Sequence, residues 1–251
     1  MDVSTALKHL RLAAVNIDGV LLNDTFSPVI REMVIDHGGD YTSEVEYALF
    51  SQPQLAAAAV FAEVTKTEVT PRQLVADYLA RREEYVARHP VRVLDGAGDL
   101  LRLLRRLGLQ VVCYGGLDRS HFDRHLDEFT DLFDPPGYVC TDGFRPGIHE
   151  IIRDVFGLEY DRAVFIDDVA KVAEVARSLG VPFIGHPNTE AQYQRSLMTR
   201  AGVRHVVRAL SDIDEDLLRT LDHEASTGVV WDTTESPAHA GTRQEGVSNE
   251  R

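Results

Sequence analysis

The sequence predicts a doubly wound α/β fold, in which a parallel β-sheet carries helices on both faces. Apolar runs without helical spacing, which are typical of buried parallel strands, alternate along the chain with amphipathic helical patterns. The strand-like runs are residues 12–17, 109–114, 162–166 and 181–184. Strands that alternate with helices in this way imply right-handed βαβ units and one parallel sheet.

Helical patterns lie between these strands. Residues 99–107 carry leucines at helical spacing and close on Gly108, and residues 169–179 repeat apolar side chains and close on Gly180. A glycine directly after the last turn is a common helix end, because glycine tolerates the left-handed backbone needed there. A further helix is predicted over residues 149–156.

The stretch from Phe26 to Pro90 has a different pattern. It contains few strand-like runs and an alanine-rich helix at residues 54–64. A second helix is opened by Thr70 and Pro71, where threonine suits the N-cap and proline suits the first turn. We therefore expect residues 26–90 to be an all-helical insert.

The remaining residues, 1–25 and 91–232, are expected to form the α/β core. Residues 233–251 contain no aromatic side chain and are rich in small polar and charged residues, so we expect a disordered tail. Trp231, just before that tail, is expected to pack the C-terminal segment against the core.

Composition and charge restrict the partners. The formal net charge of −14 argues against nucleic acid or an anionic membrane, and it means that a phosphate site needs a local cation. No apolar run approaches the roughly 20 residues that span a bilayer, and the first ten residues lack a signal-peptide core. Two cysteines, Cys113 and Cys140, cannot build a disulfide framework, so a reducing, cytoplasmic compartment is expected. Nothing in the sequence predicts the oligomeric state.

Polar and glycine residues follow the predicted strands at their carboxyl ends, where the working residues of an open parallel sheet lie. Asn16 and Asp18 alternate along the end of the first strand, so both side chains point the same way. Gly19 then permits a sharp turn, which is also the plainest reading of an isolated Asp-Gly pair.

Two further strand-end signatures favour anion binding. Gly115 and Gly116 follow Tyr114 at the end of the second strand, where exposed backbone amides can hold an anion or simply form a turn. Arg145 stands before the helix at residues 149–156 and can supply the local cation, although a lone arginine is more often on the surface.

The adjacent carboxylates Asp167 and Asp168 are the strongest single signal. They directly follow the hydrophobic strand at residues 162–166, where two like charges repel each other unless a cation or hydrogen-bond donors lie beside them. A helix N-cap formed by Asp168 is the structural alternative.

In this order and spacing, the four signatures resemble those of the haloacid dehalogenase (HAD) superfamily. That family has Asp-x-Asp-Gly-Thr at the first strand, Ser or Thr after the second, Lys or Arg before the third motif's helix, and Gly-Asp or Asp-Asp at the fourth. A helical cap after the first motif is typical of one large subgroup, and residues 26–90 fit it. The resemblance covers residues 10–210 and implies a Rossmann-like HAD core with an inserted helical cap.

The resemblance implies a hydrolase of phosphatase type that acts on a small phosphorylated metabolite. Asp18 then corresponds to the acid/base, and Arg145 steadies the phosphate. Tyr114, Gly115 and Gly116 stand at the phosphate-binding position.

The resemblance also implies a Mg²⁺ site. Its ligands correspond to the side chain of residue 16, the backbone carbonyl of Asp18 and the carboxylate of Asp168, with Asp167 beside them. Charge neutralisation of this kind is what phosphoryl transfer requires.

The family's nucleophile position is occupied here by Asn16. A neutral amide has no anionic oxygen to attack phosphorus, and it removes one negative charge from the metal site, so Mg²⁺ should bind more weakly. Three departures accompany it: Val20 in place of threonine, Tyr114 in place of a small hydroxyl residue, and Val172 where Asp or Asn often supports the metal. Together they fit natural divergence better than one engineered change.

Three functions stay open. The first is a phosphohydrolase in which Asn16 is engineered or deamidated to Asp, although deamidation before the β-branched Ile17 should be slow. The second is a HAD frame turned to different chemistry, with Asp18 as acid/base. The third is a catalytically silent binding or regulatory protein.

A few histidines and a tyrosine are weaker candidates. His121 and His125 lie four residues apart on a predicted helix, a spacing that can bind zinc but more often serves capping or faces solvent. The resemblance implies that the cap faces the site, so His37 and Tyr41, in and beside the predicted loop at residues 36–40, are candidate substrate contacts.

Overall fold

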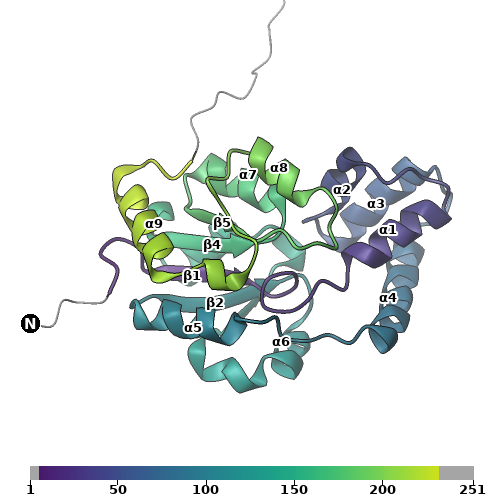
Figure 1. Cartoon of the computed structure of the whole chain (residues 1–251). Coiled ribbons are helices and arrows are strands. Elements are labelled where there is room, and N and C mark those ends of the chain that lie inside the picture. The colour runs from purple at the N-terminus through teal and green to yellow at the C-terminus, as the bar shows by residue number, and fades with distance from the viewer. Residues whose placement is uncertain (1–5, 232–251) are drawn as a thin grey trace, which may run out of the picture.

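The computed structural model describes residues 6–231, and in that range the predicted doubly wound α/β fold is confirmed (Figure 1). Its sheet has six strands, all parallel, in the order β3-β2-β1-β4-β5-β6. The strands are β1 (Leu12–Asn16), β2 (Gln110–Gly115), β3 (Tyr138–Cys140), β4 (Ala163–Asp167), β5 (Phe183–Gly185) and β6 (His205–Val206). The four predicted strands are β1, β2, β4 and β5. The sequence patterns missed β3 and β6, which are too short to show a period.

Helices cover both faces of the sheet, as a doubly wound fold requires. One face packs against α5 (Ala97–Arg106), α6 (Arg119–His125) and α9 (Glu215–Thr227), and the other packs against α7 (Ala170–Leu179) and α8 (Gln194–Arg200). Figure 1 shows α5 and α6 on one side of the strands and α7 and α8 on the other. The helices predicted at residues 99–107 and 169–179 are α5 and α7.

Between β1 and α5 the described chain forms four helices and no strand. They are α1 (Ser27–Asp36), α2 (Ser43–Leu49), α3 (Gln54–Thr65) and α4 (Pro71–Arg88). The predicted N-terminus of α4 is confirmed, because the Thr70 hydroxyl accepts a hydrogen bond from the Gln73 backbone and the Gln73 side chain accepts one from Thr70. Figure 1 shows these four helices together at one end of the sheet.

Short irregular helical segments connect the remaining elements. Four are 3₁₀ turns, at Asp127–Leu132, Asp142–Phe144, Tyr160–Arg162 and Leu210–Asp212. The helix predicted at residues 149–156 is observed as a π-helical segment, Glu150–Val155.

The core is divided by the sheet into two apolar clusters. Side chains alternate along β1, so that Ala13 and Val15 join the cluster under α5 while Leu12 and Ala14 join the cluster under α7. All four are fully buried. A strand buried on both faces explains why β1 reads as a continuous apolar run.

The end of the described chain returns to the core, as predicted for Trp231. Its indole nitrogen donates a hydrogen bond to the Val181 carbonyl at 3.2 Å, and its ring lies 6.0 Å from the ring of Phe183. The predicted disordered tail, residues 233–251, lies outside the described residues. Within residues 6–231, no helix is both long and apolar enough to cross a membrane.

Candidate functional site

The carboxyl ends of β1, β2 and β4 bring the predicted site residues together. Asn16 ends β1 and lies opposite Tyr114 of β2 in the strand register. On its other side β1 pairs with β4, which ends at Asp167. Since β1 lies between β2 and β4, signatures that are 100 to 150 residues apart in sequence meet at one edge of the sheet.

The Asn16 side chain is buried and is held by two acceptors. Its amide nitrogen donates to the backbone carbonyl of Asp18 at 2.7 Å and to Oδ1 of Asp168 at 3.0 Å. Only 5% of the residue is exposed. The amide therefore bridges two of the oxygens that the family resemblance assigns to Mg²⁺.

Asp168 is enclosed by amide groups and glycine backbone. Its second oxygen, Oδ2, accepts a hydrogen bond from the Asn188 side chain at 2.8 Å. Gly19 has φ +87°, and a Cβ at this position would overlap the Asp168 carboxylate, so two independent reasons require glycine there. Burial, and then the charge of Asp167, raise the pKa of Asp168 well above its usual range.

Asp167 and Tyr114 form a separate buried pair. The Tyr114 hydroxyl donates to Asp167 Oδ2, and the Val169 backbone nitrogen donates to Oδ1 at 2.7 Å. Burial raises the pKa of Asp167, and these hydrogen bonds oppose that effect. Neither side chain lines the cavity described below. The prediction that Tyr114 binds phosphate is thus not supported by its geometry, because its hydroxyl is committed to Asp167.

Asp18 has a partner that the strand-end signatures did not reveal. His121 Nε2, from the first turn of α6, lies 2.9 Å from Asp18 Oδ1. Their side chains are 9% and 14% exposed. A carboxylate accepts from an imidazole N–H, so this contact orients both groups.

The predicted histidine pair is close in space but does not form a metal cluster. The His121 and His125 rings pack edge to face with centroids 4.9 Å apart. Among residues 6–231, no group of three or more His, Cys, Asp or Glu side chains is arranged to hold a metal ion. The structure thus associates His121 with Asp18 instead.

Arg145 supplies a cation at this edge of the sheet. In the described chain it forms no ion pair, and its Nε is buried without a hydrogen-bond partner. The guanidinium lies directly on Gly116, where a Cβ would overlap it. A buried donor that the protein leaves unsatisfied is costly unless a ligand or water completes it.

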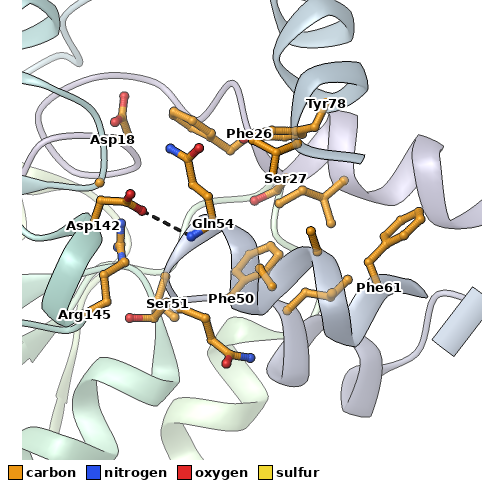
Figure 2. Close-up of a pocket in the computed structure, with 18 of the residues that line it drawn as sticks. Asp18, Phe26, Ser27, Phe50, Ser51, Gln54, Phe61, Tyr78, Asp142 and Arg145 are labelled. Carbon is orange, nitrogen blue, oxygen red and sulfur yellow. Dashed lines mark hydrogen bonds between the residues drawn. The ribbon is translucent and has the colours of Figure 1, made fainter. Parts of the chain in front are cut away.

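A cavity of about 200 Å³ lies between this edge of the sheet and the helices α1 to α4. Figure 2 shows Asp18, Asp142 and Arg145 on one side of it and Phe50, Phe61 and Tyr78 on the other. The polar residues that line it are Asn16, Asp18, Asp24, Ser27, Ser51, Gln52, Gln54, Asp142, Arg145 and Asp168. A second hollow, lined by His121, shares Gln54, Gly116, Leu117 and Asp142 with it.

Several residues of the candidate site were not recognised from the sequence. Asn188 follows β5 at the same sheet edge, so the strand-end rule that found Asp168 applies to it as well. Asp24 and Asp142 carry no such signal. His37 and Tyr41, the predicted substrate contacts, do not line the cavity: His37 bonds to the Met33 carbonyl and Tyr41 to Glu46.

No protein-family model matches this sequence, and no curated protein matches it. Solved structures match its fold. A HAD-family hydrolase from Deinococcus radiodurans, solved with bound phosphate and sodium, is 18% identical with a TM-score of 0.56, over 84% of this chain and 97% of its own. The β-phosphoglucomutase of Clostridium difficile is 13% identical with a TM-score of 0.64, over 87% of this chain and 99% of its own.

A phosphonoacetaldehyde hydrolase-like protein from Oleispira antarctica is also 13% identical, with a TM-score of 0.63, over 89% of this chain and 96% of its own. At such identities the likeness concerns the fold, and the predicted HAD-like fold is confirmed by it. The names of these three proteins cover different reactions, so the activity has to be argued from the site.

Proposed function

Because this chain has the HAD-like fold, we propose that it is a hydrolase of phosphohydrolase ancestry that acts on a small phosphorylated metabolite without an aspartyl-phosphate intermediate. The observation that carries the proposal is that Asp18, held by His121, and the unpaired Arg145 line adjoining parts of one cavity. An acid/base and an anion anchor are the minimum that hydrolysis of a phosphate ester requires of the protein.

Arg145 is the proposed phosphate anchor. Its guanidinium has no carboxylate partner among residues 6–231, and it lies beside Gly116 at the end of β2. In a chain with a net charge of −14, an unpaired arginine is the local cation that an anionic substrate needs. The planar fork of donors matches two phosphate oxygens.

Asp18 is the proposed general base. Oδ1 is held by His121, and in the described structure no donor is bonded to Oδ2. A water in the cavity would lose a proton to Oδ2 as its oxygen bonds to phosphorus, and the phosphorus–oxygen ester bond would break. The leaving alkoxide would take a proton from solvent, and Asp18 would release its proton from Oδ2 to water in the cavity, while the His121 N–H stays on Oδ1.

The residues at this site do not fit a divalent cation. The Asn16 amide nitrogen stands between the Asp18 carbonyl and Asp168 Oδ1, so its hydrogens are directed at two oxygens that would face the metal. Hard cations require oxygen ligands, and an N–H in that position repels them. We therefore assign no step of the reaction to Mg²⁺.

The covalent route is also not supported by Asn16 in its present form. Conversion to Asp requires the Ile17 backbone nitrogen to attack the Asn16 side chain. That nitrogen donates a sheet hydrogen bond to the Tyr114 carbonyl at 2.9 Å, and Ile17 is fully buried. Both facts disfavour deamidation in the folded protein.

A catalytically silent ligand-binding protein is the second candidate. One observation favours it: both oxygens of Asp168 accept from side-chain amides, of Asn16 and Asn188, which leaves this carboxylate no role in turnover. The same cavity and Arg145 would then retain a phosphorylated ligand unchanged.

A screen of phosphorylated metabolites with release of inorganic phosphate as readout separates the two candidates. The protein is assayed in EDTA and in Mg²⁺, with Asp18→Asn as the inactive variant. We expect turnover that is unaffected by EDTA and falls by about 10²- to 10⁴-fold in Asp18→Asn, the range for loss of a general base.

Asp118→Asn, which alters an exposed helix-capping carboxylate near His121, is the matched control and should keep its activity. Turnover that persists in Asp18→Asn would contradict the assigned base, and dependence on Mg²⁺ would contradict the metal-free route. Binding of a phosphorylated ligand without any turnover would favour the second candidate.

A further inference from the structure

The cavity has two chemically different ends. The end at the sheet edge holds Asp18, Asp142 and Arg145, and the other end lies among the insert helices, where Phe50, Phe61 and Tyr78 are visible in Figure 2. Within residues 26–90, the aliphatic and aromatic residues that line the cavity are Phe26, Ile30, Met33, Leu49, Phe50, Ala57, Ala58, Phe61, Leu74, Val75 and Tyr78. We call this set the apolar chamber.

All of the helices α1 to α4 contribute to the apolar chamber. Met33, Leu49, Phe61 and Leu74, one from each helix in turn, are each no more than 6% exposed. Apolar side chains that line an open cavity are not solvated well by the few waters it holds. A ligand with an apolar surface that fills the cavity would remove these side chains from water.

A ligand with many hydroxyl groups is poorly suited to this chamber. Each hydroxyl that enters it loses hydrogen bonds to water, and carbon side chains offer no replacement. A sugar phosphate would carry several such groups past Arg145 into the chamber. A hydrocarbon or aromatic group loses nothing on entering and gains contact with the walls.

Besides Arg145 Nε, two buried polar atoms in the cavity lining have no hydrogen-bond partner in the described structure, Ser51 Oγ and Asp24 Oδ2. Asp24 Oδ1 accepts hydrogen bonds from the backbone of Phe26 and Ser27, but Oδ2 is buried with no partner. A single hydroxyl or amino group on a ligand can donate the hydrogen bond that Asp24 Oδ2 lacks. The lining therefore provides for one or two polar contacts of the ligand and not for a polyhydroxylated chain.

We infer that the ligand of this site is an amphiphilic phosphorylated compound, with its anion at Arg145 and an aromatic or branched hydrocarbon body in the apolar chamber. The inference rests on the proposed function for the anionic end and names the substrate class of that same site. The body carries few hydroxyl groups, and Asp24 accepts from one of them.

The test measures binding alone, with phosphonates whose carbon–phosphorus bond is not an ester. Phenylphosphonate presents an aromatic body, 3,4-dihydroxybutylphosphonate presents two hydroxyls, and methylphosphonate presents the anionic group with almost no body. Isothermal titration calorimetry on the whole chain gives the dissociation constants. We expect phenylphosphonate to bind about tenfold or more tightly than the dihydroxy compound, a difference typical of well-buried apolar contacts.

Neighbouring alanines of α3 provide a matched pair of variants. Ala57 lines the chamber, whereas Ala56 is exposed and does not. Ala57→Phe should fill the chamber and weaken phenylphosphonate about tenfold while methylphosphonate changes less than about twofold. Ala56→Phe should change neither, and thermal unfolding of both variants verifies the fold. Ala57→Leu replaces the larger variant if Ala57→Phe does not fold.

The outcomes separate this inference from the proposed function. Equal or tighter binding of the dihydroxy compound, unchanged phenylphosphonate affinity in the filled variant, or no binding of phenylphosphonate would each overturn the inference. Hydrolysis of polyhydroxylated phosphate esters without preference for apolar ones would overturn it too, with the hydrolase proposal intact. Tight phenylphosphonate binding with no turnover of any aromatic phosphate ester would retain the inference and remove the hydrolase.

Discussion

The side-chain nitrogen of Asn16 lies 3.0 Å from Oδ1 of Asp168, at the point where β1 and β4 end side by side. An amide at position 16 therefore gives a second donor to a buried carboxylate whose other oxygen accepts from Asn188. The same contact places N–H groups where the family resemblance expects a cation. We therefore expect the side chain at position 16 to govern metal binding at this site.

Asn16→Asp should turn this site into a cation site. Without metal, a second carboxylate beside Asp168 loses two hydrogen bonds and adds repulsion, so unfolding free energy should fall by about 2–4 kcal/mol. Millimolar Mg²⁺ should restore much of that loss, measured as a rise in Tm. The unaltered protein should show no comparable rise, and an equal Mg²⁺ effect on both proteins would contradict the structure.

His121 should act as a positioning residue for Asp18. His121→Leu removes the donor at 2.9 Å, so kcat should fall about 10- to 100-fold while KM changes little. His121→Gln keeps a donor and should recover part of the loss. The NMR chemical shifts of the His121 ring should change in Asp18→Asn. Ring chemical shifts unchanged by that substitution would mean that the two groups do not interact in solution.

Gly19 should tolerate alanine much less well than Gly38. Both have positive φ, +87° and +76°, but a Cβ on Gly19 overlaps Asp168 whereas a Cβ on Gly38 meets nothing within 4 Å. Gly38→Ala should cost only the backbone strain, about 1–2 kcal/mol of unfolding free energy. Gly19→Ala should cost at least about 1 kcal/mol more, because the carboxylate must move. Denaturant unfolding of the two variants measures the difference, and equal losses would contradict the close approach.

Asp24 should make the protein less stable as the pH rises. Burial raises the pKa of Asp24 in the folded state, so its stability contribution is present below the unfolded pKa and is lost as the pH rises through the folded value. Asp24→Asn keeps the acceptor for Phe26 and Ser27 and removes the titration. The variant should therefore gain in Tm relative to the unaltered protein between pH 4 and pH 7, by a margin that grows with pH.

Asp118→Asn should change the pH dependence of stability in the opposite direction from Asp24→Asn. Hydrogen bonds from the hydroxyl and backbone of Ser120 lower the pKa of Asp118, so its contribution is present above the unfolded pKa and is lost as the pH falls. The loss of Tm in this variant should be larger at pH 7 than at pH 3. If both variants respond to pH in the same direction, the assignment of Asp24 as a buried carboxyl with a raised pKa is wrong.

The sequence by itself determined most of the fold. A strand buried on both faces must be apolar throughout, so β1, β2, β4 and β5 could be recognised, and N- and C-cap residues marked α4, α5 and α7. It also indicated Asn16, Asp18, Arg145 and the Asp167–Asp168 pair, because parallel strands deliver their carboxyl ends to one edge. The short strands β3 and β6 had no period to detect.

Only the tertiary structure decided what those residues contact. The bond of His121 to Asp18 joins residues 103 apart, and that of Asn16 to Asp168 joins residues 152 apart. No local pattern encodes such distances, because they depend on how strands and helices stack. The apolar chamber also depends on tertiary packing. Nothing in the sequence distinguishes its apolar residues from core residues, and only the packing of the helices leaves them facing a cavity. Side-chain type and local period are properties of the chain, whereas partners and empty space arise only when distant elements pack.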